Sequence, residues 1–383
     1  MKVKRLLFVF MLLVISLIAS GQNFNQRFRF EKLGVLFYNI KSHGDTLVVI
    51  GSVNLEFEPY YPAKLTVSKF DSSGSHYYNQ YFVLDSAKAY YPFSSRTHGN
   101  KTLVTDSAGY YNSGGQWGFI GMLDSNYTVQ WQKDYEPNNG NYFYYFVGGE
   151  LDANGHIIAV AANAVSEDVT THLTKFDSLG NLVWEREYKF DELNKYKPWS
   201  MLLQNDTTYL LGLEIYPKDG GTLASVRNAI IKTDSSGNVL HFWEDTTGIG
   251  GRGVQKMMSM DDGGVLFVGK RYFKDTIIGI PNSALHNMSQ SYICRLDSNF
   301  NKVWERDVGL YAGSPSLTDV SLYDFIQLAD GDYVGVGYSG GIPTVIDDIL
   351  YYKRNGLVVK FTADGEIIWE RYHNYFPDIH VLQ

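Results

Sequence analysis

Cysteine is almost absent from this chain, and its absence limits how the fold can be held together. Cys294 is the only cysteine among 383 residues. An intrachain disulfide is therefore excluded, and the fold must be stabilised by its apolar core. Cys294 lies in the apolar stretch Tyr-Ile-Cys-Arg-Leu, and Ile231 and Val359 occupy the matching places in neighbouring repeats. We therefore expect a buried structural thiol and not a nucleophile.

Charge is also scarce, and positive charge is the scarcer sign. Only 19% of the residues are charged, and the formal net charge is −8. The basic residues form no stripe along the chain. An acidic chain without a basic stripe argues against nucleic acid as a partner.

Recognisable catalytic and metal-binding motifs are missing from the sequence. It contains no GxSxG, no HExxH, no P-loop and no Cys/His spacing typical of a metal site, and its nine histidines are scattered singly. The segments Asp152–Gly155, Asp261–Gly264 and Asp330–Asp332 look like calcium loops but lack the further ligand spacing of an EF-hand. Turn formation explains them better. We therefore predict no catalytic residue, no metal site and no cofactor.

Long apolar runs are lacking too, except at the N-terminus. Lys2, Lys4 and Arg5 precede an apolar run of 13 residues at 6–18, which is too short to span a bilayer. Small residues then offer a cleavage site before Gln22. Residues 1–21 are thus predicted to be a secretory signal peptide, and the protein to be secreted or held at the outer cell surface. Its removal would change the net charge from −8 to −11, because it takes away three positive charges.

Aromatic residues are abundant, and many of them belong to a repeated phrase. The chain has 29 Tyr and 22 Phe, which suit half-buried strands. The phrase KFDSLGNLVWEREY at 175–188 recurs in related forms along the chain. Its first Asp aligns with six anchor positions, which are Asp71, Asp124, Asp177, Asp234, Asp297 and Thr362. Their spacings of 53, 53, 57, 63 and 65 residues indicate a repeat architecture.

Each repeat contains four short β segments, and its last two are joined by a tight turn at the anchor. Glycine follows the anchor by three residues in four copies, where it would adopt the left-handed conformation that closes a hairpin. Tyr127 and Phe300 stand there in the other two copies, so we expect those hairpins to close differently. Seven residues after the anchor stands a large ring, which we expect to pack between stacked sheets. The six rings are Tyr78, Trp131, Trp184, His241, Trp304 and Trp369.

Six such units predict an all-β fold, a β-propeller of six four-stranded antiparallel blades, because no blade can bury both faces alone. The blades are predicted at 30–82, 83–135, 136–188, 189–245, 246–308 and 309–373, within a single domain at 22–383. Residues 374–383 resemble the opening of a blade. They are either a closing strand or the start of a seventh blade.

Length variation is confined to the connections between strands 2 and 3 and between consecutive blades. These connections share one face of a propeller, the 2–3/4–1 face, and variable loops commonly carry binding residues. Exposed tyrosines in them could stack on sugar rings or anchor a protein partner, although any one of them is more simply explained as covering the end of a blade. The candidate ligand-binding residues are Tyr60, Tyr61, Tyr90, Tyr91, Tyr216, Tyr272, Tyr311, Tyr351 and Tyr352.

The phrase KFDSxGNxxWxxxY, preceded by DGDYVGVGYS at 330–339, resembles the blade repeat of secreted β-propeller proteins from Bacteroidota. The resemblance covers about residues 35–373. Such proteins often carry a C-terminal sorting domain for type IX secretion, which this sequence does not show. The resemblance implies a propeller blade and says little about function.

Three functions remain open from the sequence. The leading hypothesis is an exported, non-catalytic, monomeric propeller that binds a glycan or an extracellular protein through the 2–3/4–1 face. The second is a hydrolase or lyase acting on polysaccharide at a central-channel site. The third is a structural or adhesion module within a longer surface protein.

Overall fold

The computed structural model describes fifteen stretches of the chain. They are 35–43, 46–53, 64–71, 76–82, 88–110, 116–135, 143–165, 168–219, 225–247, 250–272, 289–309, 317–341, 344–346, 349–351 and 354–374. The predicted signal peptide and residues 375–383 lie outside them. The chain divides into two compact units, one of residues 1–92 and 109–113 and the other of residues 93–108 and 114–383.

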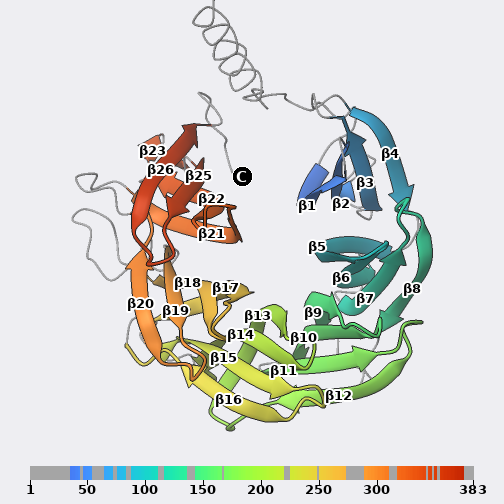
Figure 1. Ribbon diagram of the computed structural model, residues 1–383, viewed down its shortest axis with the longest axis horizontal. Helices are drawn as coiled ribbons and strands as arrows, with labels where there is room; N and C mark the ends of the chain where they lie inside the picture. The colour runs from blue at the N-terminus through green and yellow to red at the C-terminus, as the bar shows by residue number, and fades with distance from the viewer. Residues whose placement is uncertain are drawn as a thin grey trace, which may run out of the picture. The chain divides into compact units, whose positions relative to one another are not determined.

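Six four-stranded antiparallel sheets make up the fold, and we call them blades 1 to 6 (Figure 1). Blade 1 contains β1 (Val35–His43), β2 (Thr46–Val53), β3 (Lys64–Phe70) and β4 (His76–Phe82). Blade 2 contains β5 (Lys88–His98), β6 (Lys101–Tyr110), β7 (Gln116–Leu123) and β8 (Val129–Tyr135). Blade 3 contains β9 (Phe143–Leu151), β10 (Ile157–Val165), β11 (Asp168–Phe176) and β12 (Leu182–Tyr188).

The remaining blades follow in the same order. Blade 4 contains β13 (Asn194–Gln204), β14 (Thr208–Pro217), β15 (Arg227–Asp234) and β16 (Val239–Glu244). Blade 5 contains β17 (Gly251–Ser259), β18 (Val265–Tyr272), β19 (Ser289–Leu296) and β20 (Lys302–Asp307). Blade 6 contains β21 (Leu317–Gln327), β22 (Tyr333–Gly341), β25 (Arg354–Phe361) and β26 (Ile367–Asn374), and a small hairpin of β23 (Thr344–Ile346) and β24 (Ile349–Tyr351) stands between its second and third strands.

The predicted fold class is confirmed, because the described residues contain strands paired in propeller blades and no α-helix. Within each blade the strands pair in chain order, and a single parallel pair between Gln116 and Phe143 joins β7 of blade 2 to β9 of blade 3. In blades 3 to 6 the first strands lie on the inner side and the fourth strands on the outer side (Figure 1).

The turn between strands 3 and 4 has the same backbone hydrogen bonds in blades 2 to 6, and in blades 2 to 5 the Asp carboxylate accepts two more. In blade 3, the Asp177 carboxylate accepts hydrogen bonds from the backbone N–H groups of Leu179 and Asn181, at 2.9 and 2.8 Å. The N–H of Gly180 donates to the carbonyl of Asp177 at 3.0 Å, and Gly180 has a positive φ of 74°. This is the Asp-centred turn that the sequence predicts.

The expectation that two of these hairpins close differently is wrong. Tyr127 and Phe300 take φ values of 64° and 63°, and their N–H groups donate to the carbonyls of Asp124 and Asp297 as the glycines do. A side chain in the left-handed region costs about 1–2 kcal/mol. Both rings are buried, with 6% and 5% of their surfaces exposed, and this burial offsets the strain.

Consecutive blades of the larger unit pack face to face through apolar cores. One core joins blades 3 and 4 and contains Leu173, Tyr196 and Leu211. Similar cores join blades 2 to 3, 4 to 5 and 5 to 6. Cys294 is fully buried in the core between blades 4 and 5, as expected for a structural thiol, and burial raises the pKa of that thiol.

Three outer-strand tryptophans, Trp131, Trp184 and Trp304, pack against the turn of the following blade, which confirms the predicted role between sheets for these three rings. The ring of Trp131 in β8 lies so close to Gly180 that a Cβ there would stand 2.7 Å from it. Trp304 in β20 covers Gly365 in the same way, at 2.6 Å. Glycine at the turn therefore makes room for the indole of the preceding blade.

Buried polar side chains in the third strands of blades 3, 4 and 5 bond each of these blades to the next. Thr171 donates to the carbonyl of Tyr196 at 2.8 Å, and Ser291 accepts from the N–H of Leu322 at 2.8 Å. Asn228 occupies the equivalent position in blade 4. Each of these third-strand residues stands six positions before the anchor and is fully buried. They hydrogen-bond backbone groups of the next blade, as buried backbone groups require.

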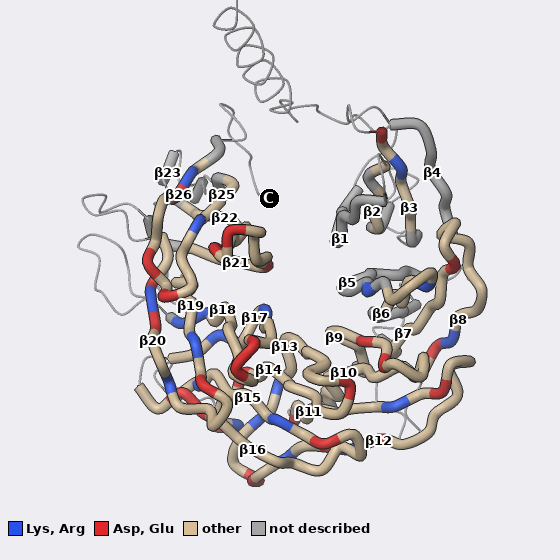
Figure 2. The backbone as a smooth tube through the Cα atoms, viewed as in Figure 1, with Lys and Arg blue, Asp and Glu red and all other residues tan. Residues whose placement is uncertain are grey.

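The charged residues of blades 3 to 6 are spread over the outer strands and turns. Figure 2 shows Lys and Arg interspersed with Asp and Glu along β20. The Asp152 carboxylate, in one of the segments that resemble calcium loops, accepts hydrogen bonds from the N–H groups of Asn154 and His156 and from the Lys175 ammonium. It therefore acts as a turn residue. In the described part of the chain, no helix has the length and apolar character needed to cross a membrane.

Candidate functional site

Tyr216 is the one predicted ligand-binding tyrosine whose side chain the structure describes. It lies half-buried near the end of β14, on the 2–3/4–1 face, with the Lys195 ammonium 5.4 Å from the centre of its ring. Tyr90 and Tyr91 in β5, Tyr272 in β18 and Tyr351 in β24 are placed by their backbone alone. Tyr60, Tyr61, Tyr311 and Tyr352 lie outside the described residues. Their binding role stays a prediction.

A β-bulge recurs near the middle of the first strand of four consecutive blades. The strand register skips one residue at Val147 in blade 3, Trp199 in blade 4, Gln255 in blade 5 and Tyr323 in blade 6. A bulge re-aims the side chains beside it, and bulges are common next to functional sites. The bulges therefore indicate a candidate site on the inner strands of blades 3 to 6.

Trp199 lies at the centre of this region. Its indole N–H donates a hydrogen bond of 2.9 Å to the carboxylate of Glu214, on the neighbouring strand β14. The ammonium of Lys197 stands 4.4 Å from the ring centre. The backbone of Gly253 in blade 5 approaches the same ring so closely that a Cβ would stand 2.3 Å from it. Gly253, with φ of 91°, is thus required by both conformation and space.

Glu214 is a half-buried carboxyl among cations. Burial raises its pKa above the ordinary value, while the hydrogen bond from Trp199 and the charges of Lys197, Arg252 and Lys270 act in the opposite direction. Burial raises the pKa of the Tyr145 phenol in blade 3, and the charge of the nearby Glu214 raises it further. A carboxyl in this setting can accept hydrogen bonds from ligand hydroxyls or exchange a proton with them.

The same arrangement continues into blade 6. The ammonium of Lys270, on β18, stands 4.6 Å from the ring centre of Tyr323, which is 51% exposed. The ring of Tyr323 packs on that of Tyr338, with centroids 5.7 Å apart. We define the inner cluster as Tyr145, Lys197, Trp199, Glu214, Arg252, Lys270, Tyr323 and Tyr338. It presents aromatic faces alternating with charged groups on the two innermost strands of blades 3 to 6.

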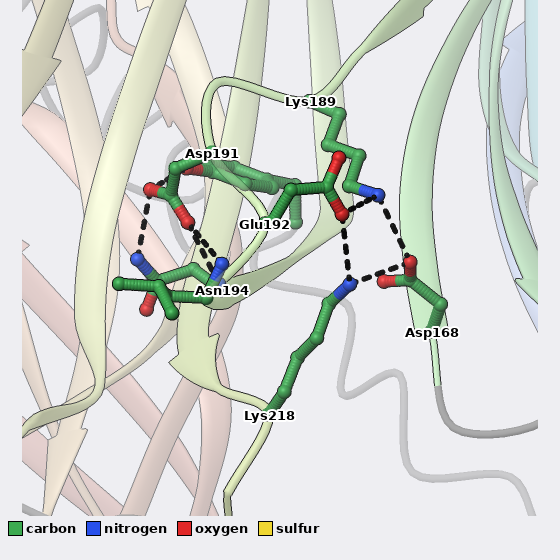
Figure 3. Close-up of polar contacts among 8 residues, drawn as sticks. Asp168, Lys189, Asp191, Glu192, Asn194 and Lys218 are labelled. Carbon is green, nitrogen blue, oxygen red and sulfur yellow. Dashed lines mark hydrogen bonds and ion pairs between the residues drawn. The ribbon is translucent and has the colours of Figure 1, made fainter.

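A second polar group, shown in Figure 3, holds the connection between blades 3 and 4 in place. The Asp168 carboxylate receives Lys218 at 2.6 Å and Lys189 at 3.2 Å. Glu192 pairs with Lys189 at 2.7 Å. This lysine clamp (Asp168, Lys189, Glu192 and Lys218) joins the first residue of β11, the blade connection and the residue after β14. Two carboxylates against two ammoniums leave it neutral, so we assign it a structural role.

Asp191 fixes the turn next to the lysine clamp. Its carboxylate accepts hydrogen bonds from the hydroxyl of Tyr196 at 2.7 Å and from the N–H groups of Leu193 and Asn194, both at 2.8 Å. The side-chain bonds from Tyr196 and Asn194 lower the pKa of Asp191 to about 2. The connection is therefore a hydrogen-bonded turn that fixes the start of β13, the strand that carries Lys197 and Trp199.

The Asp191→Asn variant is expected to be less stable than the wild type at neutral pH, with a melting temperature lower by roughly 2 °C. A depressed pKa in the folded state stabilises the fold above the ordinary value of 3.8 and loses this effect as the pH falls through about 2. The two melting temperatures should therefore converge between pH 4 and pH 2. Thermal melts across this range provide the measurement, and a constant difference would contradict the assignment.

Sequence reasoning missed the inner cluster apart from the neighbourhood of Tyr216. Its members stand singly within apolar strands, and the repeats do not share them. The second-strand residue one place beyond the pair that flanks the bulge is Ala162, Glu214, Lys270 and Tyr338 in blades 3 to 6. The residue at this position differs from blade to blade, although the repeats are otherwise similar. That variation is the sequence signal that could have identified the inner cluster.

Comparisons with known proteins give a fold likeness only. No protein-family model and no curated protein matches the chain. Solved structures that resemble it include the propeller domain of the Trilobed protease from Pyrococcus furiosus, at 10% identity and a TM-score of 0.42 over 91% of this chain and all of that one. The polysaccharide lyase Uly1 gives 7% identity and a TM-score of 0.46, over 92% of this chain and 93% of that one.

A protein of unknown function from Bacteroides caccae is also similar, at 9% identity and a TM-score of 0.27, over 70% of this chain and 95% of that one. Likeness at these levels says nothing about activity. The strand pairing and the packing between blades define the class of protein. It is a β-propeller protein with a cluster of aromatic and charged residues on the two innermost strands of four blades.

Proposed function

We propose that this protein is an exported, non-catalytic glycan-binding propeller and that the inner cluster is its binding site. The observation that carries the proposal is the alternation of aromatic rings with charged groups over four consecutive blades. Sugar rings stack on aromatic faces, while their hydroxyls need donors and acceptors fixed in place. Trp199 and Tyr323 supply the faces, and Glu214 supplies an acceptor.

The cellular setting belongs to the same proposal. The N-terminal apolar run supports export, and the repeated phrase supports a place among the secreted propellers of Bacteroidota. Proteins at that surface meet polysaccharides, which agrees with a glycan ligand.

A glycan array probed with residues 22–383 tests the proposal, followed by calorimetry on the glycans that bind. Tyr323→Ala should weaken binding by about tenfold, since stacking of one ring contributes about 1–3 kcal/mol in comparable sites. Ile326→Ala is the matched control, because Ile326 is 59% exposed on the same strand, closer to its end at Gln327, and is not a member of the inner cluster. Equal loss in both variants, or no glycan bound by the wild type, would reject the proposal.

A polysaccharide hydrolase or lyase is the second candidate, and Glu214 is the observation that favours it. Burial raises the pKa of Glu214, and a carboxyl with a raised pKa can act as a general acid or base. If the protein cleaves a glycan, Glu214→Gln should abolish product formation while binding persists. Reducing-end and unsaturated-product assays on a polysaccharide panel distinguish this candidate from simple binding.

A further inference from the structure

Blade 6 exposes apolar side chains on the face that points away from blade 5. Ile326 in β21 and Val336 in β22 are 59% and 46% exposed. In the strand register Val334 pairs with Ile326 and Val358 pairs with Val336, so these four residues share one side of the sheet. We call them the blade 6 face. Contiguous exposed apolar side chains commonly mark a surface that binds another protein.

The same positions in blade 5 form the interface with blade 6. Val268 pairs with Ile293 in blade 5 at the register positions where Val336 pairs with Val358 in blade 6. Val268 and Ile293 are fully buried in the core that joins blades 5 and 6, and Met258 packs against this core. Blade 6 thus repeats, on its open side, the apolar surface by which blade 5 contacts its neighbour. Such a surface fits another β-sheet, because two sheets pack face to face about 10 Å apart.

Charge beside the blade 6 face is compensated within blade 6 itself. Lys360 lies between Val334 and Trp369 in the strand register and so stands on the same side of the sheet. Its ammonium pairs with Asp330 at 3.1 Å and with Asp332 at 2.8 Å. The face therefore has an apolar centre and a polar edge, which is the composition of a protein–protein interface.

The surface that would complement the blade 6 face is buried in every described blade. In blade 6 this opposite side packs on blade 5 and includes Leu357 and Val359. The matching third-strand residues of blade 1 are Thr66, Ser68 and Phe70, with 2%, 0% and 2% of their surfaces exposed. A side that is already buried cannot receive the blade 6 face, so the described residues supply no partner for it.

We propose that a second copy of this chain covers the blade 6 face, in a two-fold dimer that packs the two faces together. A two-fold axis places the same patch on both sides of an interface, and an aliphatic face is complementary to itself. This dimer is independent of the proposed glycan binding, and it differs from the monomer that the sequence predicts.

The size of the face determines the expected strength of the dimer. Four strands about 4.8 Å apart, with about seven residues of about 3.3 Å each, make a face of roughly 400 Å². Two such faces, enlarged by the relief of their side chains, bury roughly 1,000 Å², an area that corresponds to a weak dimer. We therefore expect a dissociation constant on the order of 10 µM.

Sedimentation equilibrium of residues 22–383, from about 1 to about 200 µM, measures the association. The wild type should pass from monomer to dimer across this range. Val336→Lys puts a charge on the face of each copy, and like charges that face each other should weaken the association by at least about tenfold. Val303→Lys is the matched control, because Val303 is 55% exposed on β20 and lies outside the blade 6 face. It should leave the association unchanged.

Two further measurements test the arrangement. An equimolar mixture of Val336→Lys and Val336→Glu should associate more tightly than either variant alone, because opposite charges then face each other. Thiol labelling of Val336→Cys gives an independent readout, since the native Cys294 is fully buried. Labelling should slow several-fold as the protein concentration rises through the dissociation constant. Melting temperatures should show that every variant is folded.

A wild type that stays monomeric at about 200 µM overturns the inference. Rapid labelling of Val336→Cys in that monomer would show an open face, and slow labelling at every concentration would assign the face to another part of the same chain. Equal weakening by Val303→Lys, or a charged mixture that stays monomeric, would show that the association uses a different surface and would equally reject this dimer.

Discussion

The Asn228→Leu variant is expected to lose about 3–5 kcal/mol of unfolding free energy, a large share of the 5–15 kcal/mol that a typical domain has. Asn228 is fully buried in β15 and makes three hydrogen bonds of 2.7 Å. Its amide donates to the carbonyl of Lys270 and the hydroxyl of Tyr292, and its oxygen accepts from the N–H of Gly253. Leucine fills nearly the same volume but leaves all three partners buried without a bond.

The loss should be largest at the interface between blades 4 and 5. The backbone of Gly253 packs closely against the ring of Trp199. Loss of the hydrogen bond from the Gly253 N–H should therefore also make the inner cluster less ordered. Urea unfolding gives the free energy, and amide hydrogen exchange at Gly253 gives the local effect. Asn238→Leu is the control, because Asn238 is exposed and its amide bonds only within its own turn. It should cost less than about 1 kcal/mol. Similar losses in both variants would contradict the role of Asn228 in joining the blades.

The predicted repeat was sufficient for the blades because the features that define a blade are local. An Asp anchor, a turn residue in the left-handed conformation and an alternating strand follow one another within about ten residues, and Asp177 with Gly180 shows each of them in the structure. Local hydrogen bonds and backbone sterics therefore determine this part of the fold.

The inner cluster and the ties between blades could not be predicted because they depend on contacts between residues 15 or more positions apart in the sequence. Thr171 and Asn228 share a position in the repeat, yet a Thr and an Asn look unrelated until their partners in the next blade are known. Glu214 and Trp199 come together only through the register of β13 and β14 and the bulge between them. The nine predicted tyrosines were chosen for exposure in loops, a criterion that overlooks residues on strand ends.

Tyr127 and Phe300 show how a local rule is overridden. Chain propensity favours glycine at a left-handed turn position, which is why these two hairpins were expected to differ. What decides the residue is the neighbour on the preceding blade. Trp184 lies over Gly237, with its ring 3.2 Å from where a Cβ would stand, whereas the smaller ring of His241 lies over Phe300 with centroids 4.8 Å apart. Between blades 3 and 4 the large ring is Trp184 of the outer strand, whereas between blades 4 and 5 it is Phe300 of the turn.

This exchange predicts strong coupling between positions 241 and 300. Phe300→Gly alone should lose about 2–4 kcal/mol, because the buried ring leaves a cavity and only the left-handed strain is relieved. His241→Trp alone should lose about 1–3 kcal/mol, because the indole would overlap the ring of Phe300. The double variant recreates the Trp–Gly arrangement of blades 3 and 4 and should fall within about 1 kcal/mol of the wild type.

Urea unfolding of the four proteins gives the coupling energy directly, and additive losses in the double variant would contradict the exchange. The reverse exchange at the next interface, Trp304→His with Gly365→Phe, provides an independent check, since Trp304 and Gly365 form the same contact there. If the double variant is rescued in both cycles, the ring on the preceding blade determines which residue stands at the turn. The left-handed backbone conformation is then common to all these turns, whether the residue is glycine or aromatic.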